Sequence, residues 1–377
     1  MQYTILGATG SIGIQALDVV ERLGGEVLAI TGNTNAALME AQIRRHQPKY
    51  AAMADEAIAK RLRVAVADTP CEVLGGEDGV ARCAEIPCDM TLNAIVGIAG
   101  LRPTLAAIEA GNKLALANKE SLVAGGALVM ERAKARGIDI LPVDSEHSAI
   151  FQAIQGSPRA VKRLILTASG GAFFGKTLEE LRGVTIQQAL KHPSWSMGAK
   201  ITIDSATMMN KGFEVIEAAW LFRLPPAQID VLIHRQSIVH SLAEFTDHSV
   251  LAQLGNPDMR LPIQYAFTYP ARMQAIVPPL DLAQIGALTF EPPDDAVFPA
   301  VNLCRKAFEM GWEATVALNA ANEAANEMFR AGECGFLDIV QTNEEAVARV
   351  PRVCESPCLG DILELDAAVR MAVRGHC

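Results

Sequence analysis

One acidic triplet of the sequence could bind a metal ion. Asp144, Ser145 and Glu146 directly follow an apolar run at residues 138–143. If the extended conformation continues through residue 146, both carboxylates point to the same side of the chain. Two carboxylates at the end of a strand could hold a hard divalent cation. The alternative is that Ser145 caps the following helix, and the triplet alone does not decide between the two.

A second stretch combines groups that suit a phosphate. Ser205, Asn210 and Lys211 supply a hydroxyl, an amide and an ammonium just before a segment of helical periodicity. Such donors next to a helix N-terminus favour a bound phosphate. In the same segment Glu214 and Glu217 are neighbours at i,i+3. A helix cap followed by a solvated charged face is the alternative, and it is the commoner case for one such motif.

The metal follows from the chemistry of the ligands. Carboxylate oxygens favour Mg²⁺ or Mn²⁺, whereas zinc usually adds His or Cys ligands. His147 and His192 lie close to these stretches in the sequence, so a mixed site stays open.

The N-terminal segment has the glycine spacing of a phosphate-binding turn. Residues 7–13 read GATGSIG, between an apolar run at 3–6 and a helical pattern at 14–22. Glycines let the chain turn tightly and let backbone amides approach a pyrophosphate at the helix N-terminus. This context favours a bound dinucleotide over a turn with only a structural role.

The end of the next apolar run bears on which dinucleotide binds. An NAD site usually has Asp or Glu at this place to bind the ribose 2′-hydroxyl. Here Gly32, Asn33 and Thr34 carry no acid, which favours NADP, but they also lack a basic partner for a 2′-phosphate.

The elements that position these residues alternate in a regular way over the first 144 residues. Apolar runs at 3–6, 26–30, 90–96, 113–117 and 138–143 are separated by helical patterns, for example 14–22 and 104–110. This alternation predicts an α/β fold that begins with a Rossmann-like parallel sheet, at residues 1–144.

The rest of the chain divides into three further parts. Residues 145–272 predict a middle α+β domain with a helix at 148–155 and strands at 162–167, 231–245 and 250–254. Its loop 169–200 contains two capping-box patterns and is interpreted as a lid, or else as a flexible insertion. Residues 273–293 predict a linker, and residues 294–377 a C-terminal helical bundle.

Bulk composition excludes several classes of function. A formal charge of −10 without a basic run argues against a nucleic-acid or anionic-membrane partner. The eight cysteines form no C-x-x-C pair, so we expect reduced structural thiols. No apolar run is long enough to span a bilayer and no targeting segment is apparent, so we expect a cytoplasmic protein.

Seven motifs resemble those of the 1-deoxy-D-xylulose 5-phosphate reductoisomerase family. They are GATGSIG, LANKES, LPVDSEHSAIFQ, ASGG, HPSWSMG, DSATMMNKGFE and LGNPDMR, in this order. The resemblance covers nearly the whole chain. It implies that a small phosphosugar, 1-deoxy-D-xylulose 5-phosphate, is rearranged and reduced to 2-C-methyl-D-erythritol 4-phosphate with NADPH and Mg²⁺ or Mn²⁺. It also implies a homodimer, with residues 145–272 as the catalytic and dimerisation domain.

The resemblance also implies a role for each matching residue. The metal ligands would be Asp144, Glu146 and Glu214, which with Lys119 form the catalytic set. Substrate contacts would be Lys119, Ser145, Glu146, Ser169, His192, Trp195, Met197, Ser205, Asn210, Lys211 and Glu214. Trp195 and Met197 would belong to the lid. Cofactor contacts would be Thr9, Gly10, Ser11, Ile12, Gly32, Asn33, Thr34, Asn118, Glu120 and Gly198.

Two other functions remain to be weighed. A semialdehyde dehydrogenase can share the GATG opening, but it needs a catalytic cysteine beside a base, and no cysteine lies in such a motif. A non-catalytic NADP-binding regulator would leave the acidic motifs and the pair Asn210–Lys211 unexplained.

Overall fold

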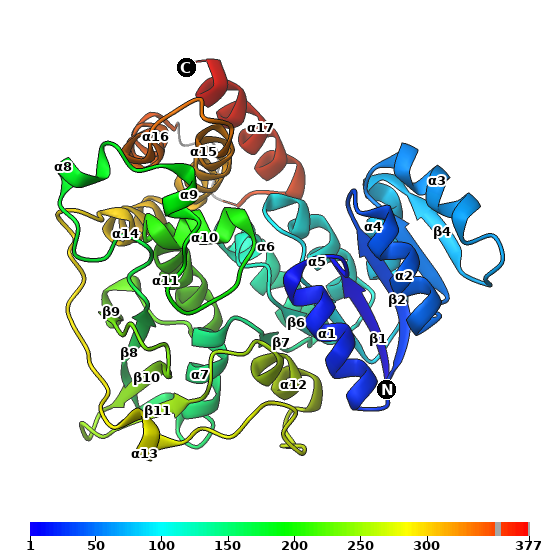
Figure 1. The fold of residues 1–377 in the computed structure, drawn as a ribbon, viewed down its shortest axis with the longest axis horizontal. Coiled ribbons are helices and arrows are strands. Elements are labelled where there is room, and N and C mark those ends of the chain that lie inside the picture. The colour runs from blue at the N-terminus through cyan, green and yellow to red at the C-terminus, as the bar shows by residue number, and fades with distance from the viewer. Residues whose placement is uncertain (351–355, 376–377) are drawn as a thin grey trace. The chain divides into compact units, whose positions relative to one another are not determined.

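The computed structural model describes residues 1–350 and 356–375, and the chain divides into two compact units (Figure 1). Unit 1 consists of Met1–Ser121, Val129–Ser148 and Asp258–Pro278. Unit 2 consists of Leu122–Leu128, Ala149–Pro257 and Pro279–Cys377. The domain boundaries expected at residues 144, 272 and 293 stay predictions.

Unit 1 contains a seven-stranded sheet in the order β4-β3-β2-β1-β5-β6-β7. Its strands are β1 Gln2–Leu6, β2 Glu26–Gly32, β3 Tyr50–Met53, β4 Glu72–Gly75, β5 Met90–Asn93, β6 Leu114–Leu116 and β7 Ile140–Pro142. Every neighbouring pair is parallel. The expected Rossmann-like sheet is therefore confirmed. Strand order reverses beside β1, and ligands of such sheets bind where the order reverses, at the carboxyl ends of the strands.

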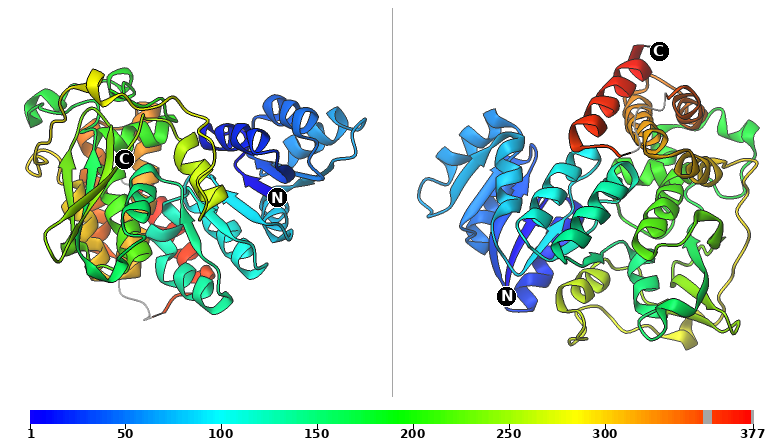
Figure 2. Two further views of the ribbon diagram at one scale, coloured as in Figure 1. Left: turned by 90° about the horizontal axis from the view of Figure 1, so that it is seen from below. Right: turned by 180° about the vertical axis from the view of Figure 1, so that it is seen from behind.

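Helices cover both faces of this sheet (Figures 1 and 2). They are α1 Ser11–Arg22, α2 Ala36–His46, α3 Glu56–Ala65, α4 Gly76–Glu85, α5 Leu101–Glu109, most of α6 Glu120–Arg136 and α12 Arg260–Thr268. α12 comes from far along the chain yet packs against α1. Its Phe267 ring lies 4.7 Å from the Tyr3 ring, and both side chains are buried.

Unit 2 contains a four-stranded sheet in the order β11-β10-β8-β9. Its strands are β8 Val161–Ala168, β9 Ile229–Ile233, β10 Val239–Phe245 and β11 Val250–Leu254. The single strand predicted at 231–245 was wrong, because residues 234–238 form a turn. The backbone amides of Ile238 and Val239 donate to His234 Nε2 there, each at 3.2 Å. Ser237, near the end of this turn, adopts a left-handed conformation with φ of 52°, which is incompatible with a continuous strand.

The helices of unit 2 share one apolar core with its sheet. They are α10 Ala199–Ala206, α11 Met209–Phe222, α14 Ala300–Met310, α15 Trp312–Ala331 and α16 Phe336–Arg349, together with most of α7 Ser145–Ala153. The last helix, α17 Leu359–Gly375, packs on α15 in a separate small cluster that contains Val373 and Met328. Leu164 of β8, Phe213 of α11 and Leu318 of α15 all belong to the same buried cluster. The helical C-terminal region is confirmed over its described residues. Cys354 and Cys377 lie outside them, and the other six cysteines are free thiols.

The two predicted capping boxes are confirmed, and the segment predicted as a linker contains a short helix and a β-bridge. Short helices α8 Leu178–Leu181 and α9 Ile186–Ala189 interrupt the segment 169–200, and each begins with a complete capping box, at Thr177 and Thr185. In the segment 273–293 a short helix, α13 Leu282–Ile285, is followed by Glu291, which pairs with Ile233 of β9.

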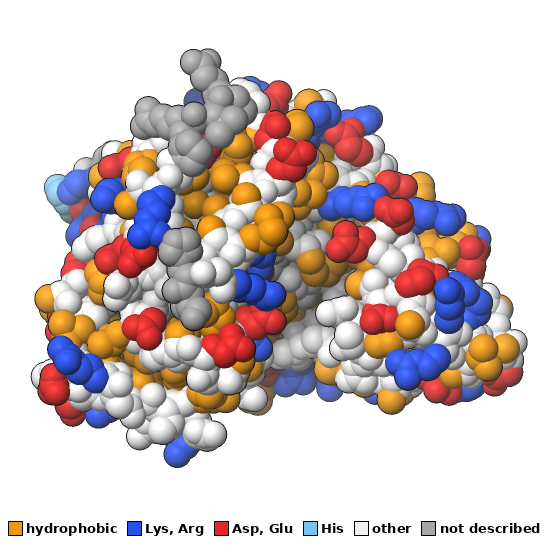
Figure 3. Space-filling model, turned by 90° about the horizontal axis from the view of Figure 1, so that it is seen from above, with side chains coloured by type: hydrophobic (Ala, Val, Ile, Leu, Met, Phe, Trp, Pro, Cys, Tyr) orange, Lys and Arg blue, Asp and Glu red, His pale blue; other side chains and the backbone are white. Residues whose placement is uncertain are grey.

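Charges of both signs are mixed on the face of the molecule that Figure 3 draws. Lys and Arg side chains are interspersed there with Asp and Glu rather than gathered in one area. Among residues 1–350 and 356–375, the helices are all too short or too polar to cross a bilayer.

Candidate active site

The β1–α1 turn forms a backbone cradle in which side chains do not fit. Gly7 has φ of +86°, and a Cβ atom there would meet the Ala94 carbonyl oxygen at 2.6 Å. A Cβ atom on Gly13 would meet the Gly7 carbonyl oxygen at 2.2 Å. Gly10 is the N-cap of α1 and has no side chain to cap it. The amides of the first helical turn therefore face outward, as a pyrophosphate site requires.

The predicted cofactor contacts near this cradle lie on two connected segments. Thr9, Gly10, Ser11 and Ile12 form the turn itself, while Gly32, Asn33 and Thr34 end β2 and follow it. The two segments are held together because the Gly7 amide donates to Thr31 Oγ1 at 3.0 Å and the Ala8 amide donates to the Thr31 carbonyl at 2.7 Å. Asn33 and Thr34 are exposed.

Asn118, a further predicted cofactor contact, follows β6, and its side chain forms several hydrogen bonds. Its amide nitrogen donates to the Ile95 and Gly97 carbonyls at 2.6 and 2.9 Å and to Glu120 Oε2 at 3.1 Å. Its carbonyl oxygen accepts from the Ser121 amide at 2.9 Å. Asn118 and Glu120 are buried. Together these bonds fix the backbone on both sides of Lys119.

Lys119 contacts the acidic triplet directly. Its Nζ lies 2.8 Å from Asp144 Oδ2, and the two side chains are 6% and 11% exposed. The expected extended triplet was wrong, because β7 ends at Pro142 and α7 begins at Ser145. Asp144 Oδ1 instead accepts from the Glu146 amide at 3.2 Å, and Ser145 Oγ donates to Glu146 Oε2 at 2.7 Å.

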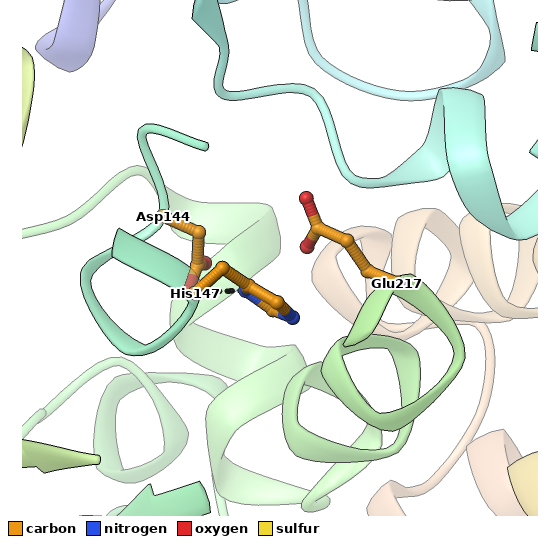
Figure 4. A group of neighbouring side chains, drawn as sticks. All are labelled: Asp144, His147 and Glu217. Atoms are coloured by element: carbon orange, nitrogen blue, oxygen red, sulfur yellow. Dashed lines mark hydrogen bonds and ion pairs between the residues drawn. The ribbon is translucent and has the colours of Figure 1, made fainter. Parts of the chain in front are cut away.

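His147, which the sequence analysis kept open as part of a mixed site, lies directly beside Asp144. Its Nδ1 lies 3.0 Å from Asp144 Oδ1, and its side chain is fully buried (Figure 4). The i,i+3 spacing from Asp144 on a helix start was the available signal. Glu217, also drawn in Figure 4, comes from α11 and is fully buried.

The phosphate motif occupies a helix–turn–helix segment of unit 2. The expectation that its donors all precede a helix was wrong: Ser205 lies inside α10, and Asn210 and Lys211 lie in the first turn of α11. Asn210 Nδ2 donates to Glu214 Oε1 at 2.6 Å, and Lys211 Nζ forms an ion pair with Glu214 Oε2. Glu214 and Lys211 are both buried.

In the segment 169–200, the side chains of Ser169 and His192 are joined by a hydrogen bond. His192 Nδ1 accepts from the Trp195 amide at 2.9 Å, and its Nε2 lies 2.9 Å from Ser169 Oγ. Burial, followed by the charge of Arg235, lowers the pKa of His192 to about 4. The neutral ring must carry its proton on Nε2, because Nδ1 is an acceptor, and it therefore donates to Ser169 Oγ. Trp195 and Met197 are partly buried, whereas Gly198, the N-cap of α10, is exposed.

Two buried cysteines, Cys83 and Cys304, are poor nucleophiles. Burial raises the pKa of Cys83 to about 12 and that of Cys304 further still. Thiols with raised pKa values stay protonated and unreactive at neutral pH. The buried thiols therefore give no support to a thioester-forming dehydrogenase.

Three family models match the chain. The model for 1-deoxy-D-xylulose 5-phosphate reductoisomerase matches residues 3–126, the model for its C-terminal domain matches residues 140–222, and a second C-terminal domain model matches residues 254–372. Together they span most of both units.

Full-length relatives and solved structures agree with these models. The 1-deoxy-D-xylulose 5-phosphate reductoisomerase of Agathobacter rectalis is 49% identical over 96% of both chains. That of Acetivibrio thermocellus is 50% identical over 98% of this chain and 97% of its own. A solved reductoisomerase in complex with NADPH, fosmidomycin and magnesium has a TM-score of 0.95 at 40% identity, covering 100% of this chain and 98% of its own. The Zymomonas mobilis enzyme with NADPH has a TM-score of 0.91 at 40% identity, with the same coverage.

Proposed function

This chain belongs to the 1-deoxy-D-xylulose 5-phosphate reductoisomerase family, and on that premise we propose how its own residues perform the family reaction. The reaction is the NADPH- and metal-dependent conversion of 1-deoxy-D-xylulose 5-phosphate into 2-C-methyl-D-erythritol 4-phosphate. The observation that carries the proposal is that Asp144 and Glu214 are well shielded from water and each contacts a lysine ammonium.

Asp144, Glu146 and Glu214 would hold the cation. They form one of two groups of described side chains that could bind an ion; the other group is Asp144, His147 and Glu217. The first group supplies only carboxylate oxygens, which Mg²⁺ and Mn²⁺ prefer. The donor set therefore fits magnesium or manganese better than zinc. When bound, the cation supplies a template and a Lewis acid for substrate oxygens.

Lys119 would work beside this cation site. Its ammonium already contacts Asp144, so it can orient that carboxylate and stabilise negative charge that develops on a substrate oxygen. The bonds of Asn118 hold the backbone on either side of Lys119, which keeps the ammonium in position.

The substrate phosphate would bind to unit 2. Ser205, Asn210 and Lys211 offer a hydroxyl, an amide and an ammonium around the start of α11, and the Ser169 hydroxyl, oriented by the Nε2–H of neutral His192, adds a further donor. Ser145 would contact the sugar hydroxyls. Binding energy from a phosphate that does not react can position the carbons that do.

NADPH would bind at the carboxyl edge of the parallel sheet. The cradle of Gly7, Gly10 and Gly13 fits a pyrophosphate, because a Cβ atom at two of these positions would collide with backbone. Gly32, Asn33 and Thr34 would lie near the adenosine ribose, while Asn118, Glu120 and Gly198 would contact the rest of the cofactor. NADPH supplies the hydride for the reduction.

The lid would separate the reaction from water. Trp195 and Met197 bring large apolar side chains to the segment 169–200, and His192 links the segment to Ser169 at its base. Closing such a segment over the substrate excludes water from a reactive intermediate.

We further propose a homodimer in the cytoplasm. β11 is an edge strand of its sheet, and its Val250 and Leu251 are 48% and 51% exposed. An exposed apolar edge is a template for pairing with another strand, and a second copy could pair antiparallel about a two-fold axis. Six free thiols suit a reducing compartment. Light scattering should give a dimer for the native chain and a monomer for Leu251→Lys.

A single assay tests the proposed reaction. The purified protein is mixed with NADPH, Mg²⁺ and 1-deoxy-D-xylulose 5-phosphate, and absorbance loss is followed with and without a chelator. We expect chelator-sensitive oxidation that yields a branched methylerythritol phosphate. If folded, NADPH-bound protein shows no oxidation with Mg²⁺ or Mn²⁺, the assignment of the substrate is wrong.

A further inference from the structure

Asp204, the residue before Ser205, carries a buried carboxylate that the proposed reaction does not use. Asp204 Oδ1 accepts from Asn322 Nδ2 and Asn326 Nδ2 of α15, each at 2.9 Å. Asp204 Oδ2 lies 3.0 Å from Lys200 Nζ. Asp204 is 2% exposed, and both asparagines are fully buried. The carboxylate thus joins two helices of unit 2, α10 and α15.

The asparagine side chains are held in one orientation by further bonds. Asn343 Nδ2 donates to Asn322 Oδ1 at 3.1 Å, and Arg330 Nε donates to Asn326 Oδ1 at 2.9 Å. Because both carbonyl oxygens are engaged as acceptors, both amide nitrogens face Asp204. Asn326 Nδ2 also donates to the Lys200 carbonyl at 3.0 Å. This last bond fixes the point where the lid segment 169–200 ends.

Stability alone does not explain this network, because apolar side chains could hold α10 and α15 together without a buried charge. A buried carboxylate needs compensating donors and charges, and equivalent apolar contacts are often as stable. Hydrogen bonds are directional, so the network also fixes the rotation of α10 relative to α15, which apolar contacts would leave less defined. A rotation of α10 would displace Ser205, which follows Asp204 directly.

The backbone that follows Ser205 is restrained as well, by the turn between α10 and α11 and by Gly171. Met208, in the turn between α10 and α11, has φ of +62°, which is unfavourable for a residue with a long side chain. Its amide donates to the Ser205 carbonyl at 3.2 Å. Gly171 lies so close that a Cβ atom there would meet the same carbonyl at 2.5 Å. The turn that carries the phosphate donors therefore depends on its surroundings for its shape.

We propose that Asp204, Asn322 and Asn326 are positioning residues that align Ser205 and the start of α11 with the phosphate of the substrate. The inference rests on the proposed function, which places the phosphate at Ser205, Asn210 and Lys211. The three residues act through this turn and do not touch the substrate.

The test compares two substrates, 1-deoxy-D-xylulose 5-phosphate and the unphosphorylated sugar 1-deoxy-D-xylulose, with saturating NADPH and Mg²⁺. Asn322→Ala and Asn326→Ala each remove one donor to Asp204. We expect kcat/KM for the phosphorylated substrate to fall about tenfold in each variant, while that for the unphosphorylated sugar changes less than about twofold. Two independent variants keep the test informative if one of them does not fold.

Asn319→Ala is the matched control. Asn319 is also fully buried on α15, but its amide donates to Glu323 at 3.0 Å and not to α10. Thermal unfolding of all three variants measures their loss of stability, and the control should keep the native ratio between the two substrates. Equal losses on both substrates, or an unchanged ratio in folded Asn322→Ala and Asn326→Ala, would overturn the proposal. If the native protein itself does not prefer the phosphorylated sugar, the proposed phosphate site is wrong instead.

Discussion

Lys119 Nζ and Asp144 Oδ2 form a buried ion pair, 2.8 Å long, between the residue that precedes α6 and the residue that precedes α7. A cation bound by Asp144 would share this carboxylate with the ammonium. Within unit 1, the pair therefore links the predicted catalytic lysine to one of the predicted cation ligands.

Replacing Lys119 by Met should separate the contribution of the ammonium to the rate from its effect on metal binding at Asp144. The variant keeps the length of the side chain but loses its charge, so kcat should fall at least about 100-fold if the ammonium stabilises the transition state. The half-saturating Mg²⁺ concentration should not rise, because the substitution removes an ammonium that competes with Mg²⁺ for the Asp144 carboxylate and adds no new competitor. Lys162→Met, which removes an exposed partner of Glu244, is the control and should retain activity. A weaker metal affinity in Lys119→Met would contradict this account.

Exchanging Glu214 for Gln should reduce metal affinity and rate together. Gln keeps the shape of the side chain but removes a charge that a divalent cation needs, so half-saturation by Mg²⁺ should rise at least about tenfold. Initial rates measured over a series of Mg²⁺ concentrations give both quantities. Glu244→Gln changes a carboxylate that pairs with Arg163 instead and should behave like the native chain. An unchanged rate and Mg²⁺ dependence would remove Glu214 from the site.

Gly13→Ala should abolish tight NADPH binding. The added Cβ atom would lie 2.2 Å from the Gly7 carbonyl oxygen, which forces the cradle to open. We expect the dissociation constant for NADPH, followed by its fluorescence, to rise at least about tenfold. Gly183→Ala places a methyl group where no atom lies within 4 Å and should bind NADPH normally. Normal binding by Gly13→Ala would mean that the cofactor does not use this turn.

Asn33→Arg should strengthen the preference for NADPH over NADH. Asn33 is exposed at the end of β2, where a guanidinium could contact a 2′-phosphate through two hydrogen bonds. The ratio of kcat/KM for the two cofactors should rise about tenfold, while that for NADH stays close to its native value. Asn33→Gln controls for the longer side chain without the charge. An unchanged ratio would place the 2′-phosphate elsewhere.

The stability of the protein should fall below pH 6.5, partly because of His240. Burial, opposed in part by backbone hydrogen bonds, lowers the pKa of His240 to about 4 from its usual 6.5. The unfolded chain therefore binds a proton at a higher pH than the folded chain, so stability is complete above pH 6.5 and declines as the pH falls towards 4. A pKa difference of this size contributes about 3 kcal/mol. Urea unfolding at several pH values should show a weaker decline for His240→Gln, whereas the exposed His248→Gln should show the native decline.

Local patterns predicted the elements and motifs well. The glycine spacing at residues 7–13 and the two capping boxes depend on neighbours in the sequence, so their geometry could be inferred from the residues alone. The alternation of apolar runs and helical patterns likewise indicated the parallel sheet.

The sequence reasoning failed where side-chain hydrogen bonds and helix starts, rather than apolar periodicity, decide the backbone. The strand expected at 231–245 breaks because the imidazole of His234 accepts two backbone amides, and no periodicity signals this. Asp144 and Glu146 were expected on an extended chain, but α7 begins one residue after Asp144. The partners of Asp204 lie more than a hundred residues away on α15, beyond the reach of any local pattern.

The return of residues 258–278 to unit 1 matters for protein engineering. Phe267 of this segment covers Tyr3, and Arg260 forms an ion pair with Asp18 of α1. An expression fragment that stops at residue 148 would expose that apolar face to solvent and should aggregate. A chimera that exchanges the nucleotide-binding half between two relatives must therefore transplant three separate stretches of the gene, the last of them from beyond its midpoint.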